Sequence, residues 1–275
     1  MSSIAKSAAR RSIPKELDNS VRDTGTLGKA MAVLEIVASS EQPPRFTDIL
    51  KQSDQPRGTL HRQLSNLVEE GLLISRPDQS YELGLKLLTF ASQSWAGSEF
   101  RTIAEPHLKD LQSETGETVH LAVLRDVQVI YLDKFEGSQS LRLHSQIGNA
   151  SPAYCTGVGK AALSQLDSKS LSERIAAMKF QQFTENTLRS AKALRAEITE
   201  IRKDGVAYDR EEHEPGIHCI AAPIHSASRA LYAGISITGP SFRISRAQLE
   251  GWADTVRETA EAIMADLETR LGPRA

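Results

Sequence analysis

Residues 56–71 have the side chains best suited to contact nucleic acid. In this segment, PRGTLHRQLSNLVEEG, Leu60, Leu64 and Leu67 recur at the spacing of one buried helical face. The opposite face would present cationic and hydrogen-bonding side chains, which bind phosphates and base edges. The candidates for DNA contact are Arg57, Gly58, Thr59, His61, Arg62 and Ser65. An ordinary amphipathic surface helix has the same periodicity, so the flanking elements decide between the two interpretations.

The flanking segments predict a winged helix-turn-helix. A helix is expected over residues 27–39 and a shorter one over 45–52, separated from residues 56–71 by a tight turn, which is helix-turn-helix spacing. Two short alternating runs then surround a Pro-Asp-Gln-Ser turn, the pattern of a β-hairpin and hence of a wing. Arg45, at the start of the short helix, and Arg76, in the wing, are two further candidates for DNA contact.

A second group of reactive side chains lies near residue 215. His213, His218 and Cys219, with Asp209 or Glu212, include the ligand types of a zinc site. His218 and Cys219 are adjacent on a predicted strand, so their side chains point to opposite faces and cannot easily share an ion. Cys219 with a histidine base could also suggest a hydrolase, but no nucleophile turn or orienting third group accompanies it. We therefore predict no metal, no cofactor and no catalytic site.

The chain after residue 85 alternates helices and strands. Residues 85–97 predict an amphipathic linker helix, and 100–115 a helix ended by Gly116. The remaining elements are expected as strands at 118–124, 127–135, 140–147, 218–224 and 231–238, helices at 157–166 and 187–203, and a C-terminal helix capped by Ser245 and running to about residue 270.

Composition is consistent with a regulator of two modest domains. The 275 residues carry 33 Lys and Arg against 35 Asp and Glu, so any DNA affinity must come from a local basic surface. No apolar run is long enough to span a membrane, and the basic N-terminus lacks the apolar region of a secretory signal. We expect a flexible arm at residues 1–23, a cytoplasmic location, and reduced Cys155 and Cys219.

Eight ordered segments carry a resemblance to a known family. These segments are PRGTLHRQLSNLVEEGLL, YELGLKLL, TGETVHLAVL, VIYLDK, LRLHSQIG, PAYCTGVGKAAL, the run from Gly205 through DREEHEPGIHCIAAPI, and GISITGP. Together they resemble the IclR-type transcriptional regulators over nearly the whole chain. LRLHSQIG and PAYCTGVGKA look most similar to the branch that senses sugar acids such as 2-keto-3-deoxygluconate.

The resemblance implies an α+β fold of distinct parts. These are a winged helix-turn-helix DNA-binding domain at residues 24–84, a linker helix at 85–98 and a GAF-like α/β effector-binding domain at 99–272. The family's members assemble as homodimers or dimers of dimers, which implies two recognition helices about 34 Å apart on a pseudo-palindromic double-stranded DNA operator. The family commonly has Ser where this chain has Gly58, so one contact to phosphate is in doubt.

The resemblance also implies a pocket for a small organic acid. Residues 155–160 supply a glycine-containing turn opening a helix, whose N-terminus favours anions. The predicted carboxylate binders are Gly157 and Val158, and the opposite wall is matched to Asp209, Ile217, Cys219, Ser236 and Thr238. Asp209 would accept hydrogen bonds from effector hydroxyls, and Ser236 and Thr238, two apart on one strand, would donate theirs. Alternatively, the glycines only permit close packing and the two hydroxyls lie on a solvated strand face.

Two functions from different classes follow. The first is a sequence-specific DNA-binding regulator, a repressor in preference to an activator, whose operator affinity a small organic acid controls. The second is an α/β enzyme or small-molecule sensor whose N-terminal helices contact other proteins. They differ in what Arg57 and Arg62 do, because only the first requires these side chains for DNA affinity.

Overall fold

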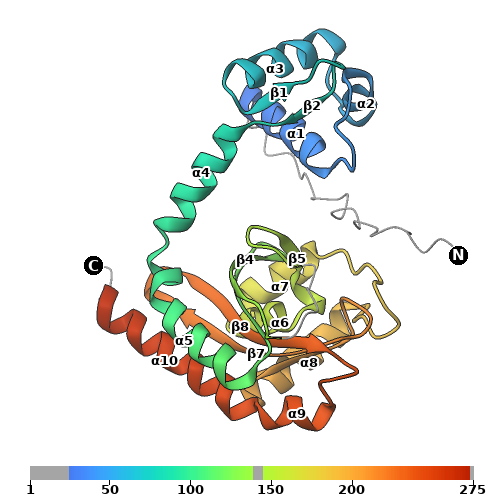
Figure 1. Cartoon of the computed structure of the whole chain (residues 1–275). Coiled ribbons are helices and arrows are strands. Elements are labelled where there is room, and N and C mark those ends of the chain that lie inside the picture. The colour runs from blue at the N-terminus through green and yellow to red at the C-terminus, as the bar shows by residue number, and fades with distance from the viewer. Residues whose placement is uncertain (1–24, 139–144, 273–275) are drawn as a thin grey trace, which may run out of the picture. The chain divides into compact units, whose positions relative to one another are not determined.

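The computed structural model describes residues 25–138 and 145–272 of the 275-residue chain. The chain divides into two compact units, the first ending at Gly97 and the second beginning at Ser98 (Figure 1). The expected 1–23 arm lies outside the described residues. No helix among those described is both long and apolar enough to cross a membrane.

The first unit is the predicted helix-turn-helix followed by a hairpin. Its elements in chain order are α1 (Gly25–Ser39), α2 (Phe46–Gln52), α3 (Arg57–Glu69), β1 (Leu73–Ser75), β2 (Tyr81–Leu83) and α4 (Leu85–Ala96). Its core is formed by Val33, Leu34, Val37, Ile49, Leu60, Leu64, Leu67 and Leu73. The leucine stripe of residues 56–71 is therefore buried as predicted, which turns the polar side of α3 outward.

Backbone geometry fixes both ends of α3. Pro56 occupies the N-cap position with extended dihedrals. At the other end Gly71 has φ +71°, and its N–H donates to the Val68 carbonyl over 3.0 Å. The N–H of Leu72 donates to the Leu67 carbonyl over 2.9 Å, which completes a Schellman ending. Gly71 is needed here because side chains rarely adopt this left-handed conformation.

The hairpin is attached to the start of α2. Leu73 pairs with Leu83 and Ser75 with Tyr81, and a further bridge joins Arg45 to Ser80. The Tyr81 N–H also donates to the Pro44 carbonyl over 2.9 Å. The wing is thus held in register with the helix-turn-helix.

The second unit is built on one six-stranded sheet. Its strands are β3 (Thr118–Arg125), β4 (Gln128–Phe135), β5 (Ala150–Pro152), β6 (Ala207–Arg210), β7 (Ile217–Ser226) and β8 (Leu231–Pro240). They lie in the order β5-β4-β3-β8-β7-β6, and every pairing is antiparallel. The central hairpin predicted from residues 218–238 is the β7–β8 pair.

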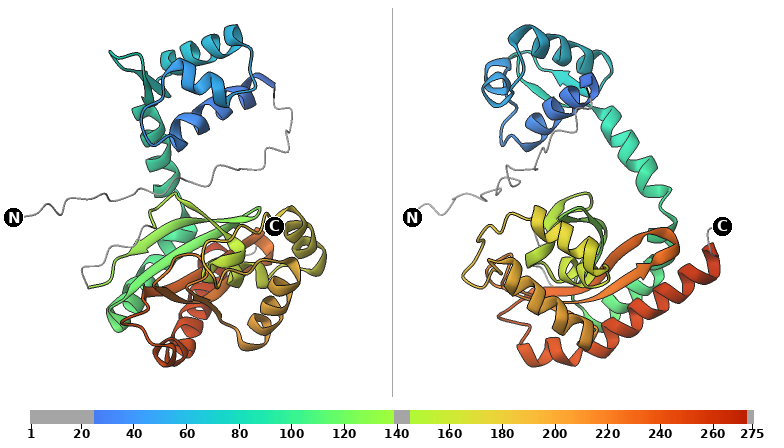
Figure 2. Two further views of the ribbon diagram at one scale, coloured as in Figure 1. Left: turned by 90° about the vertical axis from the view of Figure 1, so that its right-hand side faces the viewer. Right: turned by 180° about the vertical axis from the view of Figure 1, so that it is seen from behind.

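Helices cover both faces of this sheet (Figure 2). One face packs on α5 (Glu99–Thr115) and α10 (Ala253–Leu271), the other on α6 (Gly157–Ser164), α7 (Ser168–Ala177) and α8 (Ala191–Asp204). Alternation along β8 separates them: Ile235 and Ile237 face α10, while Ser236 and Thr238 lie on the α6 side. Both faces of the sheet are therefore covered, so the two hydroxyls are not on a solvated surface.

Several expected elements differ from the structure. Most of the strand expected at 140–147 lies outside the described residues, and its described part, 145–147, is not a strand. The helix expected from 187 begins after its cap at Ser190, whose hydroxyl accepts from the Ala193 N–H. The C-terminal helix is capped by Ser245 as predicted but is divided at Trp252 into α9 (Arg246–Gly251) and α10. The sequence reading missed α7, β5 and β6.

Candidate nucleic-acid interface and effector pocket

The polar face of α3 is open to solvent. Arg57, Gly58, His61, Arg62 and Ser65 are exposed, and Thr59 is half-buried. The Arg57 guanidinium lies 5.2 Å from the centre of the Phe46 ring, a cation–π contact that orients it without neutralising it. Arg62 forms no salt bridge within the described part of the chain. The helix therefore presents two cationic side chains that are available to contact phosphates or base edges.

The two cations predicted outside α3 differ in their surroundings. Arg45 is exposed at the N-cap of α2, where its backbone N–H donates to Asp48 Oδ2 over 3.2 Å. Arg76, in the wing, is exposed but forms a salt bridge of 3.3 Å with Glu82. A phosphate would have to share or displace Glu82 before Arg76 could bind it.

One cavity in the second unit brings together all seven predicted effector-binding residues. The empty space within it totals about 440 Å³, part of which is open to solvent. Gly157, Val158, Asp209, Ile217, Cys219, Ser236 and Thr238 line it, together with His120, Tyr131, Ser145, Thr156, His213 and Glu214. The floor is the α6-facing side of the sheet, and the first turn of α6 closes one wall.

The strand register explains why residues distant in sequence meet here. Asp209 on β6 pairs with Cys219 on β7, and Cys219 pairs with Thr238 on β8. Ser236 pairs with His120 on β3. Because paired residues point to the same face of a sheet, these side chains form two neighbouring rows on the cavity floor.

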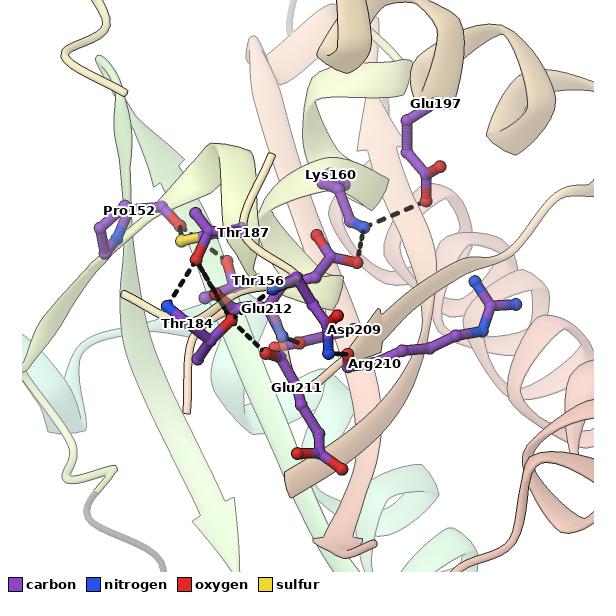
Figure 3. Close-up of polar contacts among 12 residues, drawn as sticks. Pro152, Thr156, Lys160, Thr184, Thr187, Glu197, Asp209, Arg210, Glu211 and Glu212 are labelled. Atoms are coloured by element: carbon purple, nitrogen blue, oxygen red, sulfur yellow. Dashed lines mark hydrogen bonds and ion pairs between the residues drawn. The ribbon is translucent and has the colours of Figure 1, made fainter. Parts of the chain in front are cut away.

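The N-terminus of α6 lacks a side-chain cap. Its N-cap residue, Thr156, instead donates its hydroxyl to the Pro152 carbonyl over 2.9 Å (Figure 3). The first backbone N–H groups of α6 are then not satisfied by that side chain, and Gly157 and Val158 belong to the cavity lining. Such N–H groups, aligned with the helix dipole, attract a carboxylate.

The glycines of this turn also have a packing role. A Cβ on Gly157 would lie 2.8 Å from Cys219 Sγ, and one on Gly159 would lie 2.4 Å from both Cα and the carbonyl oxygen of Ala153. Close packing was the alternative explanation for these glycines, and it applies at both. It also brings the first turn of α6 against the strands that form the cavity floor.

His120 joins the hydroxyls of the cavity floor. Its Nε2 lies 2.7 Å from Ser145 Oγ, and its Nδ1 lies 3.4 Å from Ser236 Oγ and 3.4 Å from Thr238 Oγ1. Burial, reinforced by the nearby Lys134 ammonium, lowers the pKa of His120 to about 3. The ring is thus neutral, with one donor and one acceptor nitrogen. Sequence reasoning missed it because a lone histidine on an apolar strand has no distinguishing pattern.

A buried cluster of charged side chains lies next to Asp209. Lys160 of α6 is fully buried, and its Nζ donates to Glu212 Oε1 over 2.5 Å and to Glu197 Oε1 over 3.0 Å (Figure 3). Asp209 is also buried, and its Oδ1 accepts from the Glu212 N–H over 2.7 Å. Burial, with the Glu212 charge added, raises the pKa of Asp209 to about 7, although Lys160 acts in the opposite direction.

The turn that follows Asp209 is anchored by two threonine hydroxyls. Thr187 Oγ1 donates to the Glu212 carbonyl over 2.7 Å, and Thr184 Oγ1 donates to the Glu211 carbonyl over 2.6 Å (Figure 3). Glu211 adopts φ +61°, a conformation that these bonds help to hold. His213 and Glu214, further along the turn, are thereby placed in the cavity wall. From the sequence, His213 was considered only as a metal ligand or as the base of a hydrolase, and Glu214 was not selected.

The histidines and Cys219 do not gather into a metal centre. His218 Nδ1 lies 2.8 Å from the Ile244 carbonyl, whereas Cys219 lines the cavity on the other side of β7. No group of three metal-ligating side chains occurs among the residues the structure describes. Burial raises the pKa of the Cys219 thiol to about 12, so it is neutral rather than a nucleophilic thiolate.

Comparison with known proteins agrees with this two-part architecture. Residues 26–77 match the model of the IclR helix-turn-helix domain, and residues 93–265 match that of the bacterial transcriptional regulator IclR C-terminal domain. The chain is 32% identical to the HTH-type transcriptional regulator BhcR of Paracoccus denitrificans, covering 89% of this chain and 88% of the relative. It is 26% identical to the HTH-type transcriptional regulator KdgR of Escherichia coli, over 92% of this chain and 96% of the relative.

A solved structure shows the same fold. The crystal structure of the Thermotoga maritima IclR superposes with a TM-score of 0.66 at 31% identity, covering 90% of this chain and 98% of that one. Both family models and the relatives matched over most of their length indicate the same family. The chain belongs to the IclR family of bacterial transcriptional regulators.

Proposed function

We propose that this regulator binds an operator through α3 and that a small organic acid of the sugar-acid class, bound at the α6 cavity, controls its operator affinity. One observation carries the proposal: the cavity combines an uncapped helix N-terminus with a floor of hydroxyls, in a chain whose recognition helix has an open polar face. An acid with hydroxyl or carbonyl oxygens matches both halves of the cavity.

The effector makes two kinds of contact in the cavity. Its carboxylate accepts hydrogen bonds from the backbone N–H groups of Gly157 and Val158 at the start of α6. Its remaining oxygens meet Ser236, Thr238 and His120 on the floor. Ile217 and Cys219 supply the apolar walls that limit size.

The DNA-bound form is proposed to be a homodimer or a dimer of dimers on a pseudo-palindromic duplex. Two copies of α3 would enter successive major grooves about 34 Å apart, with Arg45 and Arg76 at flanking phosphates. The linker helix α4 buries none of its residues, and Leu85 and Leu88 are 73% and 67% exposed. A second copy of this chain would cover that apolar surface.

We propose repression as the mode of action, because subunits bound across an operator exclude other proteins from it. The effector prefers one arrangement of the oligomer and changes operator affinity only by its differential affinity for the two states, typically about 1 to 3 kcal/mol. We also propose that the chain has no catalytic site, which the protonated Cys219 thiol supports. We propose a cytoplasmic location as well, because the proposed partner is chromosomal DNA.

Fluorescence anisotropy tests this function. The full chain is titrated onto labelled DNA from upstream of its own gene and onto a scrambled duplex, over a salt series, with and without 2-keto-3-deoxygluconate, D-gluconate and an aromatic carboxylic acid. We expect binding that is specific, salt-sensitive and altered by one of the sugar acids. Equal binding to both duplexes under every condition would contradict the proposal and favour a role for the N-terminal helices in protein contacts.

A further inference from the structure

The cavity proposed for an acid has no Lys or Arg in the part of its lining that the structure describes, within residues 25–138 and 145–272. Among the thirteen residues that line it there is no Lys or Arg, whereas Asp209 and Glu214 both carry carboxyl groups. His120 is neutral, as described above. Lys134 pairs with His120 across β3 and β4 but is not part of the lining, and its ammonium donates to the Ser145 carbonyl over 2.9 Å. Its strand β4 is four strands from β6, which holds Asp209. A bound carboxylate would therefore add negative charge to a buried site already rich in carboxyl groups.

The nearest buried ammonium compensates Asp209 only in part. The Lys160 Nζ is already bound to Glu212 over 2.5 Å and to Glu197 over 3.0 Å. One cation thus faces three carboxyl groups, those of Glu197, Glu212 and Asp209. Of the three, Asp209 has no salt-bridge partner in the described part of the chain.

Three further titratable groups around Asp209 are neutral. Cys219 faces it from β7 and Cys155 from the turn before α6, and burial raises the pKa of both thiols, so both are neutral. Tyr131 of β4 is a neutral phenol, because burial raises its pKa. The imidazole of His213 lies 3.8 Å from the Glu214 carboxylate.

We propose that the pocket takes up one proton together with its acidic effector, and that Asp209 holds this proton. This inference rests on the proposed function and deepens it. Asp209 in its protonated form becomes a hydrogen-bond donor and offers an O–H to an acceptor oxygen of the effector. No bond other than that proton's is made or broken: a proton from the buffer is transferred to a carboxylate oxygen of Asp209.

Electrostatics supports the choice of Asp209. Two negative charges a few ångströms apart in a buried site repel strongly, and protonation of one removes the repulsion. Asp209 Oδ1 accepts from the Glu212 N–H over 2.7 Å, and we place the proton on Oδ2. The ligand-free pKa of about 7 means that the proton is available at little free-energy cost near neutral pH. The expectation that ionised Asp209 accepts from effector hydroxyls is thereby replaced.

Isothermal titration calorimetry in pairs of buffers with different ionisation enthalpies counts the protons. The full chain is titrated with 2-keto-3-deoxygluconate and with D-gluconate. We expect uptake of about one proton per site near pH 8, falling toward zero near pH 5. Above the pKa of Asp209 the dissociation constant should rise about tenfold per pH unit.

Two amide variants identify the carboxyl group that takes up the proton. Asp209→Asn keeps an acceptor for the Glu212 N–H and supplies a permanent donor, so it should bind the acid without proton uptake and with a dissociation constant that does not change between about pH 6 and pH 8. Glu214→Gln, the matched control on the same wall, should retain the uptake. A far-ultraviolet circular dichroism spectrum checks that both variants are folded.

Each other result overturns a separate claim. Binding without proton uptake in the unsubstituted protein, or loss of binding in Asp209→Asn, would mean that ionised Asp209 accepts from the effector and would contradict the inference alone. Uptake that persists in Asp209→Asn would place the proton on the effector, on His213 or on Glu214, of which Glu214→Gln tests the last, and would also contradict it. Failure of both acids to bind would contradict the proposed sugar-acid function itself.

Discussion

The polar faces of α3 and of the cavity use similar side chains in opposite ways. On α3, Arg62 and Ser65 are exposed and stand on a leucine stripe that folds without them. In the cavity, Ser236 and His120 are 2% and 3% exposed and are hydrogen-bonded to each other, and Ser236 is also hydrogen-bonded to Thr238. Functional groups of the first kind are added to a stable helix, whereas those of the second kind are part of the core.

This difference predicts how each region responds to substitution. Changes on α3 should alter DNA affinity and leave the free energy of unfolding almost unchanged. Changes in the cavity should alter ligand affinity and stability together, because the same atoms serve both. Single substitutions in each region test that separation.

Gly159→Ala should lower the free energy of unfolding of the second unit by about 3 kcal/mol or more. The new Cβ would lie 2.4 Å from the Ala153 backbone, which cannot move without displacing α6 from the sheet. Urea denaturation followed by circular dichroism measures the change. An unfolding midpoint equal to that of the unsubstituted protein would show that the α6 turn is not tightly packed.

Asp209→Asn should stabilise the protein at high pH by an amount on the order of a few kcal/mol. Because burial and Glu212 raise the pKa of the folded Asp209 to about 7, the native state holds this proton more tightly than the unfolded state does. The contribution of Asp209 to stability therefore falls as pH rises from about 4 to about 7, and the amide is free of this effect. Urea midpoints near pH 5 and pH 8 give the difference.

A matched aspartate serves as the control for that measurement. Asp167 caps α7, where hydrogen bonds from Ser170 hold its pKa below the usual value. The change in the free energy of unfolding caused by Asp167→Asn should be the same at about pH 5 and pH 8, because Asp167 is ionised at both. A pH response equal in the two variants would show that Asp209 has no special position.

Arg62→Ala should weaken operator binding by about 1 to 3 kcal/mol if Arg62 reads a guanine. If it holds a phosphate instead, all sequences should be weakened alike and the salt slope should fall by about 1. Thermal unfolding should be unchanged, because the side chain is exposed and forms no salt bridge in the described residues. Arg246→Ala, an exposed arginine of α9, is the control and should leave operator affinity intact.

Gly58→Ala should raise stability by about 0.5 to 1 kcal/mol, the opposite sign to Gly159→Ala. Nothing lies within 4 Å of the position a Cβ would take, and alanine favours the helix. Differential scanning calorimetry resolves the first unit's transition. Destabilisation by this change would mean that the surface of α3 is packed against other residues. The contrast between the exposed face of α3 and the packed cavity would then not hold.

The sequence predicted the first unit more completely than the second. Leu60, Leu64 and Leu67 recur within one helix, so local periodicity alone indicates which face of α3 is buried. The end of α3 at Gly71 was readable for the same reason, since one residue's dihedral angles determine it.

The cavity required long-range information. Asp209, Cys219 and Thr238 form one row only because β6, β7 and β8 pair in a particular register, which no local pattern encodes. The resemblance supplied these residues, whereas His120, Tyr131 and Glu214 were missed. The salt bridge between Arg76 and Glu82 was also not predictable from the sequence, because it depends on the register of the hairpin.

The most direct test measures the acid-induced change in operator affinity in three proteins: the unsubstituted chain, Ser236→Ala and Arg62→Ala. Anisotropy of the labelled operator is recorded with increasing 2-keto-3-deoxygluconate. We expect Ser236→Ala to bind the operator normally but to need about tenfold more acid, and Arg62→Ala to bind it weakly while responding at the usual acid concentration. If Ser236→Ala weakened ligand-free operator binding as much as Arg62→Ala does, the two regions would not be separable and the account would be wrong.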